Sequence, residues 1–342
     1  MKALLCTSPG TVEWREVPTP RIEDDAHAIV RPLAVARCDV DLLFAMGMIQ
    51  PGRPFALGHE CIAEVVEIGD GVRSVAPGDV VAVPFQINCG LCGACRRGLT
   101  ACCESVPFRS SYGMPLTEKD WGGALADFLL VPFADAMLVP APSGVPATVA
   151  CGAGDNIADG WRTVAPYLAE RPGASVLVVG TGHTAVGLYS VDIALALGAR
   201  RVDYLAPDGP ALAMAEKLGA RAIQSPYEGR HGPYEITSNA TVDADALKLA
   251  LASTAPGGVC TNQGPFSAGD VPLPVTAMYS RGVTFETSRV QSRAALPAVL
   301  ELLERDCLHV ADITTRTVEW SVVDDAWLEP SVKLIARHAG VA

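Results

Sequence analysis

Four closely spaced cysteines constrain this chain more than any other feature of its sequence. Cys89, Cys92 and Cys95 form two C-x2-C steps that share a cysteine, and Cys103 follows eight positions later. Glycines between them let the loop turn back on itself, so the thiolates can form the tetrahedral shell of a structural zinc site. The adjacent Cys102 could replace Cys103, and the spacing alone also allows an iron–sulfur cluster. With all four positions filled by protein, the metal would stabilise the loop and leave no open position for chemistry.

The length, composition and charge of the chain exclude several classes of protein. Its 342 residues are enough for two domains, each with its own core. Hydrophobic residues make up 49% and charged residues 19%, which excludes a largely disordered chain. The formal net charge of −12 argues against nucleic acid as a partner, because phosphate contacts need clustered Lys and Arg.

Neither a secretory signal nor a membrane span is expected. The first apolar run is too short for a signal, and longer apolar stretches are interrupted by Gly, Pro or charge. We therefore expect no membrane association and a cytoplasmic location. The eleven cysteines fit that location as metal ligands and buried thiols, because a reducing compartment does not keep structural disulfides.

The pattern of strand and helix signals changes twice along the sequence and divides the chain into three parts. Residues 1–145 contain short β-like runs such as HAIVRPLAVA, CIAEVVEIG and DVVAVPF, and predict a mostly β domain. Residues 146–290 alternate strands and helices, beginning with ASVLVVG, AVGLYSVDIALALG, RVDYLA and PALAMAEKLGA. Repeated βα units predict a doubly wound parallel sheet, and thus an α/β protein. Residues 291–342 hold a helix, LPAVLELLERD, and strand-like pieces that we expect to return to the first domain.

A Gly-rich turn follows the first strand of the α/β part and opens a helix. Gly180, Gly182 and Ala185 satisfy the form G-x-G-x-x-G/A. The backbone N–H groups from Gly180 through Thr181 to Gly182, with the helix amino terminus, would face a pyrophosphate. This turn predicts a dinucleotide cofactor.

A second set of potential metal ligands is scattered along the chain. It consists of Cys38, His59 with the adjacent Glu60, and Asp155. A thiol, an imidazole and a carboxylate are a ligand set expected for catalytic zinc with room for water or substrate. Asp41 is placed to orient a ligating imidazole. Nothing local brings residue 155 near residue 38, so this grouping depends on resemblance to a known family.

In order and spacing, the chain resembles the medium-chain zinc alcohol dehydrogenases along nearly its whole length. The matching segments are Cys38 with Asp41, GHE at 58–60, PGDVV at 77–81, the cysteine cluster at 89–103, WGGALADFLLVP at 121–132 and the Gly-rich turn. The resemblance implies a GroES-like catalytic domain and a Rossmann domain for NAD(H) or NADP(H). It also implies two zinc ions per chain and a homodimer or homotetramer.

The resemblance also assigns residues to the catalytic site. Cys38, His59 and Asp155 would bind catalytic zinc, with Glu60 as an adjacent or exchanging ligand. Phe85 falls where the family places an aromatic wall of the substrate pocket. Val40, in the same pocket, replaces the Ser or Thr whose hydroxyl starts the family's proton relay, and Leu43 stands where some members carry a relay His.

The cofactor residues depart from the family in two ways. Val-Gly187-Leu looks like the usual end of the motif, displaced by two extra residues. Ala206 stands where an acidic residue normally holds the adenosine ribose, and Asp208 follows just past it. No Arg follows Ala206 to accept a 2′-phosphate, which Asp208 would repel, although Arg200 and Arg201 precede the strand. We therefore favour NAD over NADP.

These features predict zinc-dependent hydride transfer between a nicotinamide and a small alcohol, aldehyde or ketone. The missing hydroxyl leaves zinc-bound water, the nicotinamide ribose or Asp39 as routes for the proton. One alternative is a reductase of an iminium ion or activated alkene, for which no oxygen needs protonation. Another is a non-enzymatic cofactor-binding protein on the same fold, against which the retained zinc ligands argue.

Overall fold

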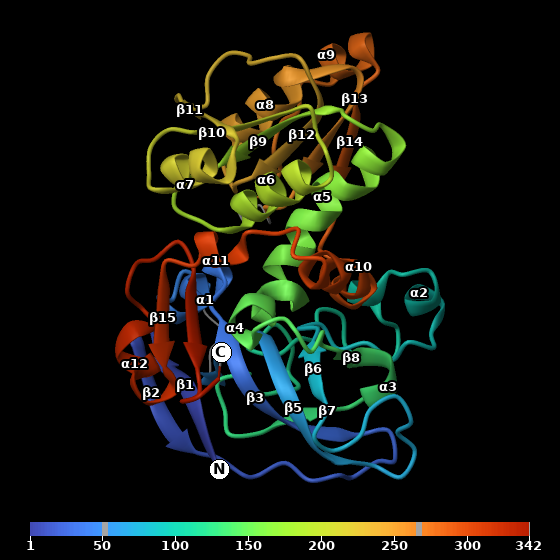
Figure 1. Ribbon diagram of the computed structural model, residues 1–342, viewed down its shortest axis with the longest axis vertical. Helices are drawn as coiled ribbons and strands as arrows, with labels where there is room; N and C mark the ends of the chain where they lie inside the picture. Colours follow the sequence, from blue (N-terminus) through green and yellow to red (C-terminus); the bar gives the residue numbers. More distant parts are fainter. Residues whose placement is uncertain (50–53, 265–268, 342) are drawn as a thin grey trace. The chain divides into compact units, whose positions relative to one another are not determined.

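The computed structural model describes residues 1–49, 54–264 and 269–341 and divides into two compact units (Figure 1). Unit 1 comprises Met1–Ala158, Gln291–Asp306 and Thr314–Ala342, and unit 2 comprises Asp159–Val290 and Cys307–Ile313. Unit 1 is mostly β and unit 2 alternates strands with helices, which confirms the predicted α/β class with two kinds of sheet. None of the described helices is long and apolar enough to cross a membrane.

Unit 1 is built on two sheets. The larger runs in the order β15-β16-β3-β5-β6-β8, with β7 also paired to β3, and the smaller runs β2-β1-β4. The larger sheet contains β3 (Ala28–Ala36), β5 (Glu60–Ile68), β6 (Val80–Val83), β7 (Leu129–Val131), β8 (Val139–Pro140), β15 (Arg316–Glu319) and β16 (Leu334–Arg337). The smaller contains β1 (Lys2–Ser8), β2 (Thr11–Glu16) and β4 (Phe55–Ala56).

The pairing of β3 with β5 positions the second ligand set. The strands are antiparallel, with Ala36 opposite Glu60. The residues just after β3 and just before β5 therefore lie at the same edge of the sheet. Cys38 follows β3 and precedes α1 (Asp39–Ala45), and His59 precedes β5.

The carboxyl-terminal tail adds two strands to this sheet. β16 pairs antiparallel with β3, and β15 pairs parallel with β16. The buried guanidinium of Arg37 donates hydrogen bonds to the carbonyl oxygens of Trp327 and Glu329 (2.5 and 2.7 Å) and to Ser331 Oγ (2.7 Å). These bonds hold the segment that leads to Lys333 against the end of β3.

Helices complete unit 1, and all but α10 are short. They are α1, α2 (Gly93–Arg96), α3 (Ala134–Met137), α4 (Ala147–Ala150), α10 (Ser292–Glu304), α12 (Val323–Ala326) and the 3-10 helices η1 (Thr100–Cys102), η2 (Cys151–Gly154) and η3 (Trp320–Val322). α10 contains the predicted LPAVLELLERD segment.

Unit 2 has six parallel strands in the order β11-β10-β9-β12-β13-β14, which is the Rossmann order. The strands are β9 (Ser175–Gly180), β10 (Arg201–Ala206), β11 (Arg221–Gln224), β12 (Tyr234–Ala240), β13 (Thr254–Asn262) and β14 (Thr284–Thr287). The helices are α6 (Val186–Ala196), α7 (Ala211–Leu218), α8 (Ala244–Ser253), α9 (Val275–Arg281) and α11 (Val310–Ile313). Every residue of β9 is buried, as expected for a central strand covered on both faces.

One long helix was not predicted from the sequence. α5 (Asn156–Glu170) has 15 residues and begins directly after Asp155. Gly160 and Pro166 lie inside it, and both residue types are signals against a helix interior. Gly160 allows close packing instead, because a Cβ there would lie 2.9 Å from the backbone N of Ser190 on α6.

Candidate metal centres and cofactor turn

Cys38, His59, Glu60 and Asp155 lie together in unit 1. Each offers one ligand atom, and these atoms all lie within 4.8 Å of one another among four buried residues. Asp155 arrives from η2, whose last residue it follows, while the other three flank β3 and β5. Thiol sulfur, imidazole nitrogen and carboxylate oxygen are the donors that zinc takes in catalytic sites. The donor set and its spacing therefore fit a zinc ion.

A carboxylate behind the imidazole sets the orientation of His59. Its Nδ1 lies 2.9 Å from Asp41 Oδ1, and its Nε2 lies 3.1 Å from Asp155 Oδ2. Asp41 is held in turn by the backbone N–H of Cys38, which donates to its Oδ2 at 3.0 Å. Burial lowers the pKa of His59, but the Asp41 and Asp155 carboxylates outweigh it and raise that pKa well above its usual value. Asp41 thus keeps Nε2 directed at the other ligand atoms.

The amide of Asn156 supports two of the potential ligands. Its Nδ2 donates to Cys38 Sγ (3.1 Å) and to Asp155 Oδ2 (3.0 Å). Burial and the nearby Asp155 charge raise the pKa of Cys38 to about 12. A divalent cation reverses that preference, because a coordinating thiol is deprotonated. Sequence reasoning missed Asn156, although its place next to Asp155 and before a helix was a signal.

A buried lysine holds Glu60. Lys333 Nζ donates to Glu60 Oε1 (2.9 Å) and Oε2 (3.0 Å) and to Asn156 Oδ1 (2.9 Å), and the Lys333 and Glu60 side chains are both 0% exposed. Burial raises the pKa of Glu60 to about 8, although Lys333 opposes that rise. Sequence reasoning missed Lys333 as well. The signal was a single ammonium inside the otherwise apolar run VKLIA.

The two residues assigned to the substrate pocket lie in different surroundings. Phe85 is buried, and its ring centroid lies 5.3 Å from that of His59. Val40 lies in α1 and packs against the hydrophobic core of unit 1. Phe85 therefore borders the potential metal ligands, whereas Val40 is half-buried at the edge of the core.

The four-cysteine lobe, residues 89–103, forms a second group. Ligand atoms of Cys89, Cys92, Cys95 and Cys103 lie within 4.8 Å of one another, while Cys102 is exposed. None of the eleven cysteines, all of which lie within the described residues, forms a disulfide. Four sulfurs in this arrangement match a structural zinc site, and the pattern of exposure favours Cys103 over Cys102 as the fourth member.

Hydrogen bonds to sulfur stabilise the thiolate form of Cys89. Its Sγ accepts from the hydroxyl of Ser105 (3.1 Å) and from the backbone N–H groups of Leu91 (3.4 Å) and Cys92 (3.3 Å). Burial opposes ionisation, but these donors outweigh it and lower the pKa of Cys89 to about 6. Cys89 therefore favours the thiolate form that binds a cation, whereas burial raises the pKa of Cys95 to about 12.

In unit 2, the Gly-rich turn folds tightly against the segment after β10. A Cβ on Gly182 (φ +84°) would lie 1.7 Å from the backbone oxygen of Asp208, and one on Gly180 would lie 2.2 Å from Tyr204 Oη. The N–H of Gly182 donates to Tyr204 Oη at 3.3 Å, and that of His183 donates to Thr181 Oγ1 at 3.1 Å. Two amides of the turn are thus engaged within the protein.

The helix after the turn begins later than the literal motif. α6 starts at Val186, with the buried Ala185 as its N-cap residue. Gly187 lies inside the helix, and a Cβ there would lie 3.2 Å from both Ala240 and Tyr204. Gly187 therefore has the close-packing role of the last glycine in the motif, as expected for a turn with two additional residues.

Charged residues near β10 divide between the two edges of the sheet. Asp208 lies at the carboxyl edge beside the turn, where its Oδ1 is 3.0 Å from His183 Nε2. Arg200 pairs with Glu235, and Arg201 with the buried Asp203 (2.5 and 2.6 Å). Arg201 is aligned with Ser175, the first residue of β9, so both arginines lie at the opposite edge from the turn.

Unit 1 holds a group of sulfur, nitrogen and oxygen ligand atoms, and unit 2 is a Rossmann sheet. This combination is typical of metal-dependent nicotinamide dehydrogenases. Residues 24–143 match the alcohol dehydrogenase GroES-like domain. The chain is 30% identical to a probable zinc-binding alcohol dehydrogenase of Mycobacterium tuberculosis over 330 residues, 93% of this chain and 82% of that protein. It is 28% identical to zinc-type alcohol dehydrogenase B of Aspergillus flavus, over 90% of this chain and 73% of that protein.

Comparison with solved structures leads to the same class of protein. The alcohol dehydrogenase of Thermus sp. ATN1 superposes with a TM-score of 0.88 at 28% identity, covering 99% of this chain and all of that one. The chain belongs to the zinc-dependent medium-chain dehydrogenase family. It is a zinc-dependent oxidoreductase that uses a nicotinamide cofactor.

Proposed function

We propose that this enzyme transfers hydride between NAD(H) and a small alcohol, aldehyde or ketone, with the substrate oxygen bound to a zinc ion held by Cys38, His59 and Asp155. The observation that carries this proposal is the convergence of these ligand atoms, with Glu60, within 4.8 Å. Zinc in such a site acts as a Lewis acid on the substrate oxygen.

The residues around the ligands have separate tasks in this proposal. Asp41 keeps the Nε2 of His59 directed at the metal through its contact with Nδ1. Asn156 donates to Cys38 and Asp155 and restrains both. Lys333 binds both carboxylate oxygens of Glu60, so that Glu60 is an adjacent group that becomes a ligand only when it leaves Lys333.

The second zinc ion would be held by the four-cysteine lobe and would be structural. Cys89, Cys92, Cys95 and Cys103 would supply all four ligands of a tetrahedral zinc ion and leave no position for substrate. With the first group, this would make two zinc ions per chain.

The preference for NAD is supported by the charges at the carboxyl edge of the sheet. Asp208 beside the turn would repel a 2′-phosphate, and Arg200 and Arg201 lie at the other edge in ion pairs with Glu235 and Asp203. The imidazole of His183, which contacts Asp208 beside the turn, is a group that could favour the phosphate.

A second candidate function follows from Val40. This half-buried side chain packs against the core of unit 1 and carries no hydroxyl with which to pass a proton to the substrate oxygen. A substrate whose carbon accepts hydride without protonation of an oxygen, such as an iminium ion or activated alkene, would avoid that step. Strong turnover of simple alcohols would exclude this candidate, and turnover of a cyclic iminium ion alone would select it.

We also propose that the enzyme is a cytoplasmic homodimer or homotetramer. The absence of disulfides among the described cysteines suits a reducing compartment. β14 is an edge strand of the unit 2 sheet, where a second copy can pair. Light scattering during size-exclusion chromatography measures the number of chains.

The test is metal content by mass spectrometry on the wild type and a His59→Ala variant, with a hydride-transfer screen using both cofactors. We expect two zinc ions per chain in the wild type, and one in the variant with activity lost. One zinc ion in both proteins would overturn the catalytic site. Cofactor binding without turnover of any substrate would instead support a non-enzymatic cofactor-binding protein on the same fold.

A further inference from the structure

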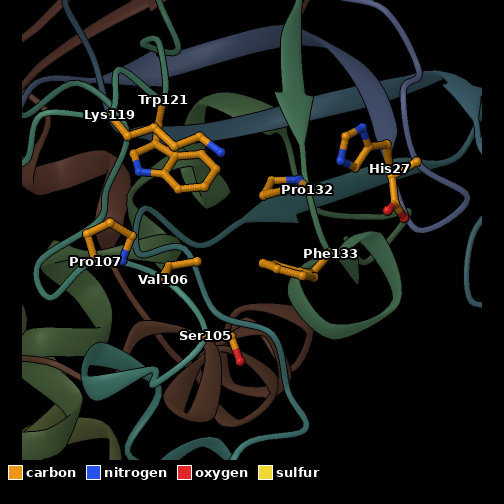
Figure 2. Close-up of a pocket in the computed structure, with 9 residues that line it drawn as sticks. His27, Ser105, Val106, Pro107, Lys119, Trp121, Pro132 and Phe133 are labelled. Carbon is orange, nitrogen blue, oxygen red and sulfur yellow. The ribbon is translucent and has the colours of Figure 1, made fainter.

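A cavity in unit 1 lies next to the four-cysteine lobe and contains none of the potential metal ligands (Figure 2). Phe133, Val106 and two prolines form apolar walls, and Lys119 and Asp24, which carry opposite charges, are both exposed. Such a lining selects no class of ligand. A more informative arrangement lies in unit 2, where the glycines of the cofactor turn surround one buried side chain.

The phenol of Tyr204 lies against all three glycines of the cofactor motif. Tyr204 belongs to β10 and is 0% exposed. A Cβ on Gly180 would lie 2.2 Å from its Oη, and one on Gly187 would lie 3.2 Å from its Cε2. The third glycine, Gly182, donates its backbone N–H to the same hydroxyl at 3.3 Å. The motif is therefore built around this ring.

Tyr204 explains why position 180 is a glycine. Gly180 does not belong to the glycines with positive φ, so other residues could adopt its backbone conformation. The three atoms nearest to a Cβ on Gly180 all belong to Tyr204, and they lie 2.2, 2.5 and 2.6 Å away. The restriction at this position thus comes from the phenol and not from the backbone of the turn.

The same hydroxyl changes which amides are left for the cofactor. The Gly182 N–H donates to Tyr204. The His183 N–H donates to Thr181 Oγ1 at 3.1 Å. α6 begins at Val186, and the first N–H groups of a helix have no partner within that helix. The amides available to a diphosphate therefore lie at the start of α6 rather than at Gly182 and His183.

A second tyrosine restrains the turn from its other peptide group. Tyr227 comes shortly after β11, and its hydroxyl donates to the carbonyl oxygen of Gly180 at 2.7 Å. Burial, together with the charges of Asp243 and Asp208, raises the pKa of Tyr227 to about 12. This hydroxyl therefore keeps the proton that it donates. One tyrosine accepts from the turn and the other donates to it.

We propose that Tyr204 is a positioning residue for the nicotinamide cofactor. Its hydroxyl fixes the Gly182 peptide, and with it the path of the two additional residues of the turn, so that the first amides of α6 meet the diphosphate. The proposal rests on the proposed function in that the cofactor binds at this turn.

The first test is Tyr204→Phe, which removes the hydroxyl and keeps the ring. Calorimetry on the zinc-loaded enzyme measures the binding of NADH and of ADP-ribose. We expect each Kd to rise about tenfold, because the Gly182 N–H loses its acceptor. Adenosine, which has no diphosphate, is followed by ligand-observed NMR and should bind with an unchanged Kd. An unchanged Kd for NADH, or equal weakening of all three ligands, would overturn the proposal.

Tyr234→Phe is the matched control. Tyr234 is also 0% exposed, but it is the first residue of β12, and its hydroxyl donates to Asp203. We expect this variant to be less stable than the wild type and to bind NADH with the same Kd. A rise as large as that in Tyr204→Phe would show a general effect of losing a buried hydroxyl and would overturn the proposal.

A second test uses the contact between Tyr204 and Gly180. Gly180→Ala places a Cβ against the phenol and should weaken NADH binding by at least about tenfold. Tyr204→Leu removes the three atoms that this Cβ would meet. We therefore expect the double variant to bind NADH within about twofold of Tyr204→Leu, a comparison that does not need Gly180→Ala itself to fold. If the added methyl group weakens binding by more than that in the Tyr204→Leu background, it meets something other than the phenol, and the proposal fails.

Binding measurements separate this proposal from the proposed function. A wild type that binds NADH and transfers no hydride would contradict the proposed function, while the Kd values of Tyr204→Phe would still support or overturn the role of Tyr204. Hydride transfer by the wild type, with a Kd for NADH that Tyr204→Phe does not change, would overturn the role of Tyr204 alone.

Discussion

Replacing Lys333 with methionine should destabilise unit 1 more than any comparable change of a surface lysine. Met has a similar length and no charge, so the variant removes three hydrogen bonds, two to Glu60 and one to Asn156, without opening a large cavity. Both partners of the ion pair are fully buried. The Glu60 carboxylate would remain in the core without its counter-charge.

The magnitude follows from that burial. Removing one partner of a buried ion pair typically costs about 3–5 kcal/mol, because the other charge is left uncompensated. Glu60 can reduce this cost by taking up a proton, since its pKa is already raised to about 8. We therefore expect the lower end, about 3 kcal/mol. At ~2–4 °C per kcal/mol for a unit of this size, the melting temperature should fall by at least about 6 °C.

A double-mutant cycle measures the coupling directly. The proteins are the wild type, Lys333→Met, Glu60→Gln and the double variant, each compared by thermal melting with zinc content recorded in parallel. In the double variant neither position leaves an uncompensated charge, so its loss should be smaller than the sum of the single losses by about 2 kcal/mol. Lys248→Met, at an exposed ion pair, is the control and should change stability by less than about 0.5 kcal/mol.

Two results would refute the reasoning. If Lys333→Met melts within about 2 °C of the wild type, the buried ammonium does not stabilise Glu60. If the losses of the single variants simply add, Lys333 and Glu60 act independently, and Lys333 has no part in keeping Glu60 from the metal.

Three further predictions test the lobe, the turn and the unit 2 sheet. Cys103→Ser should lose the structural zinc ion and most folding of unit 1. Cys102→Ser, at an exposed position, should keep two zinc ions per chain by mass spectrometry, and the reverse result would assign Cys102 to the metal. Gly182→Ala should weaken NADH binding in calorimetry by at least about tenfold, because its Cβ would overlap the Asp208 oxygen and the turn must move. The control is Gly78→Ala, with φ +94° and open space around it, which carries only backbone strain of ~1–2 kcal/mol. Equal NADH binding by both variants would contradict this role of the turn. Asp203→Asn should destabilise the protein by about 1–3 kcal/mol at neutral pH, because Arg201, Arg221 and Tyr234 all donate to Asp203 and, against the effect of burial, lower its pKa. A lowered folded-state pKa contributes stability that is full above the unfolded value of about 3.9 and is lost as the pH falls through the folded-state pKa. The melts of wild type and variant should therefore begin to approach each other as the pH falls below about 4. A constant difference down to about pH 3 would show that the carboxylate charge is not responsible.

The sequence alone was sufficient where the physical cause is local. Strand and helix periods predicted the sheet of unit 2, because each βα unit carries its own hydrophobic pattern. The lobe was predictable because Cys89, Cys92 and Cys95 lie within one tight loop, and short-range geometry alone can bring their sulfur atoms together. The G-x-G turn was recognisable for the same reason.

Tertiary structure decided what depends on distant segments. The antiparallel register of β3 and β5, and the arrival of η2, bring Cys38, His59 and Asp155 together, and only resemblance to a family had suggested that grouping. Lys333 reaches Glu60 across 273 positions of sequence, because β16 pairs with β3 and Arg37 holds the preceding segment. The engagement of the Gly182 amide by the Tyr204 hydroxyl likewise joins two neighbouring strands. No local sequence pattern encodes these contacts. The burial of each side chain and the identity of its partner depend on segments that meet only in the folded chain.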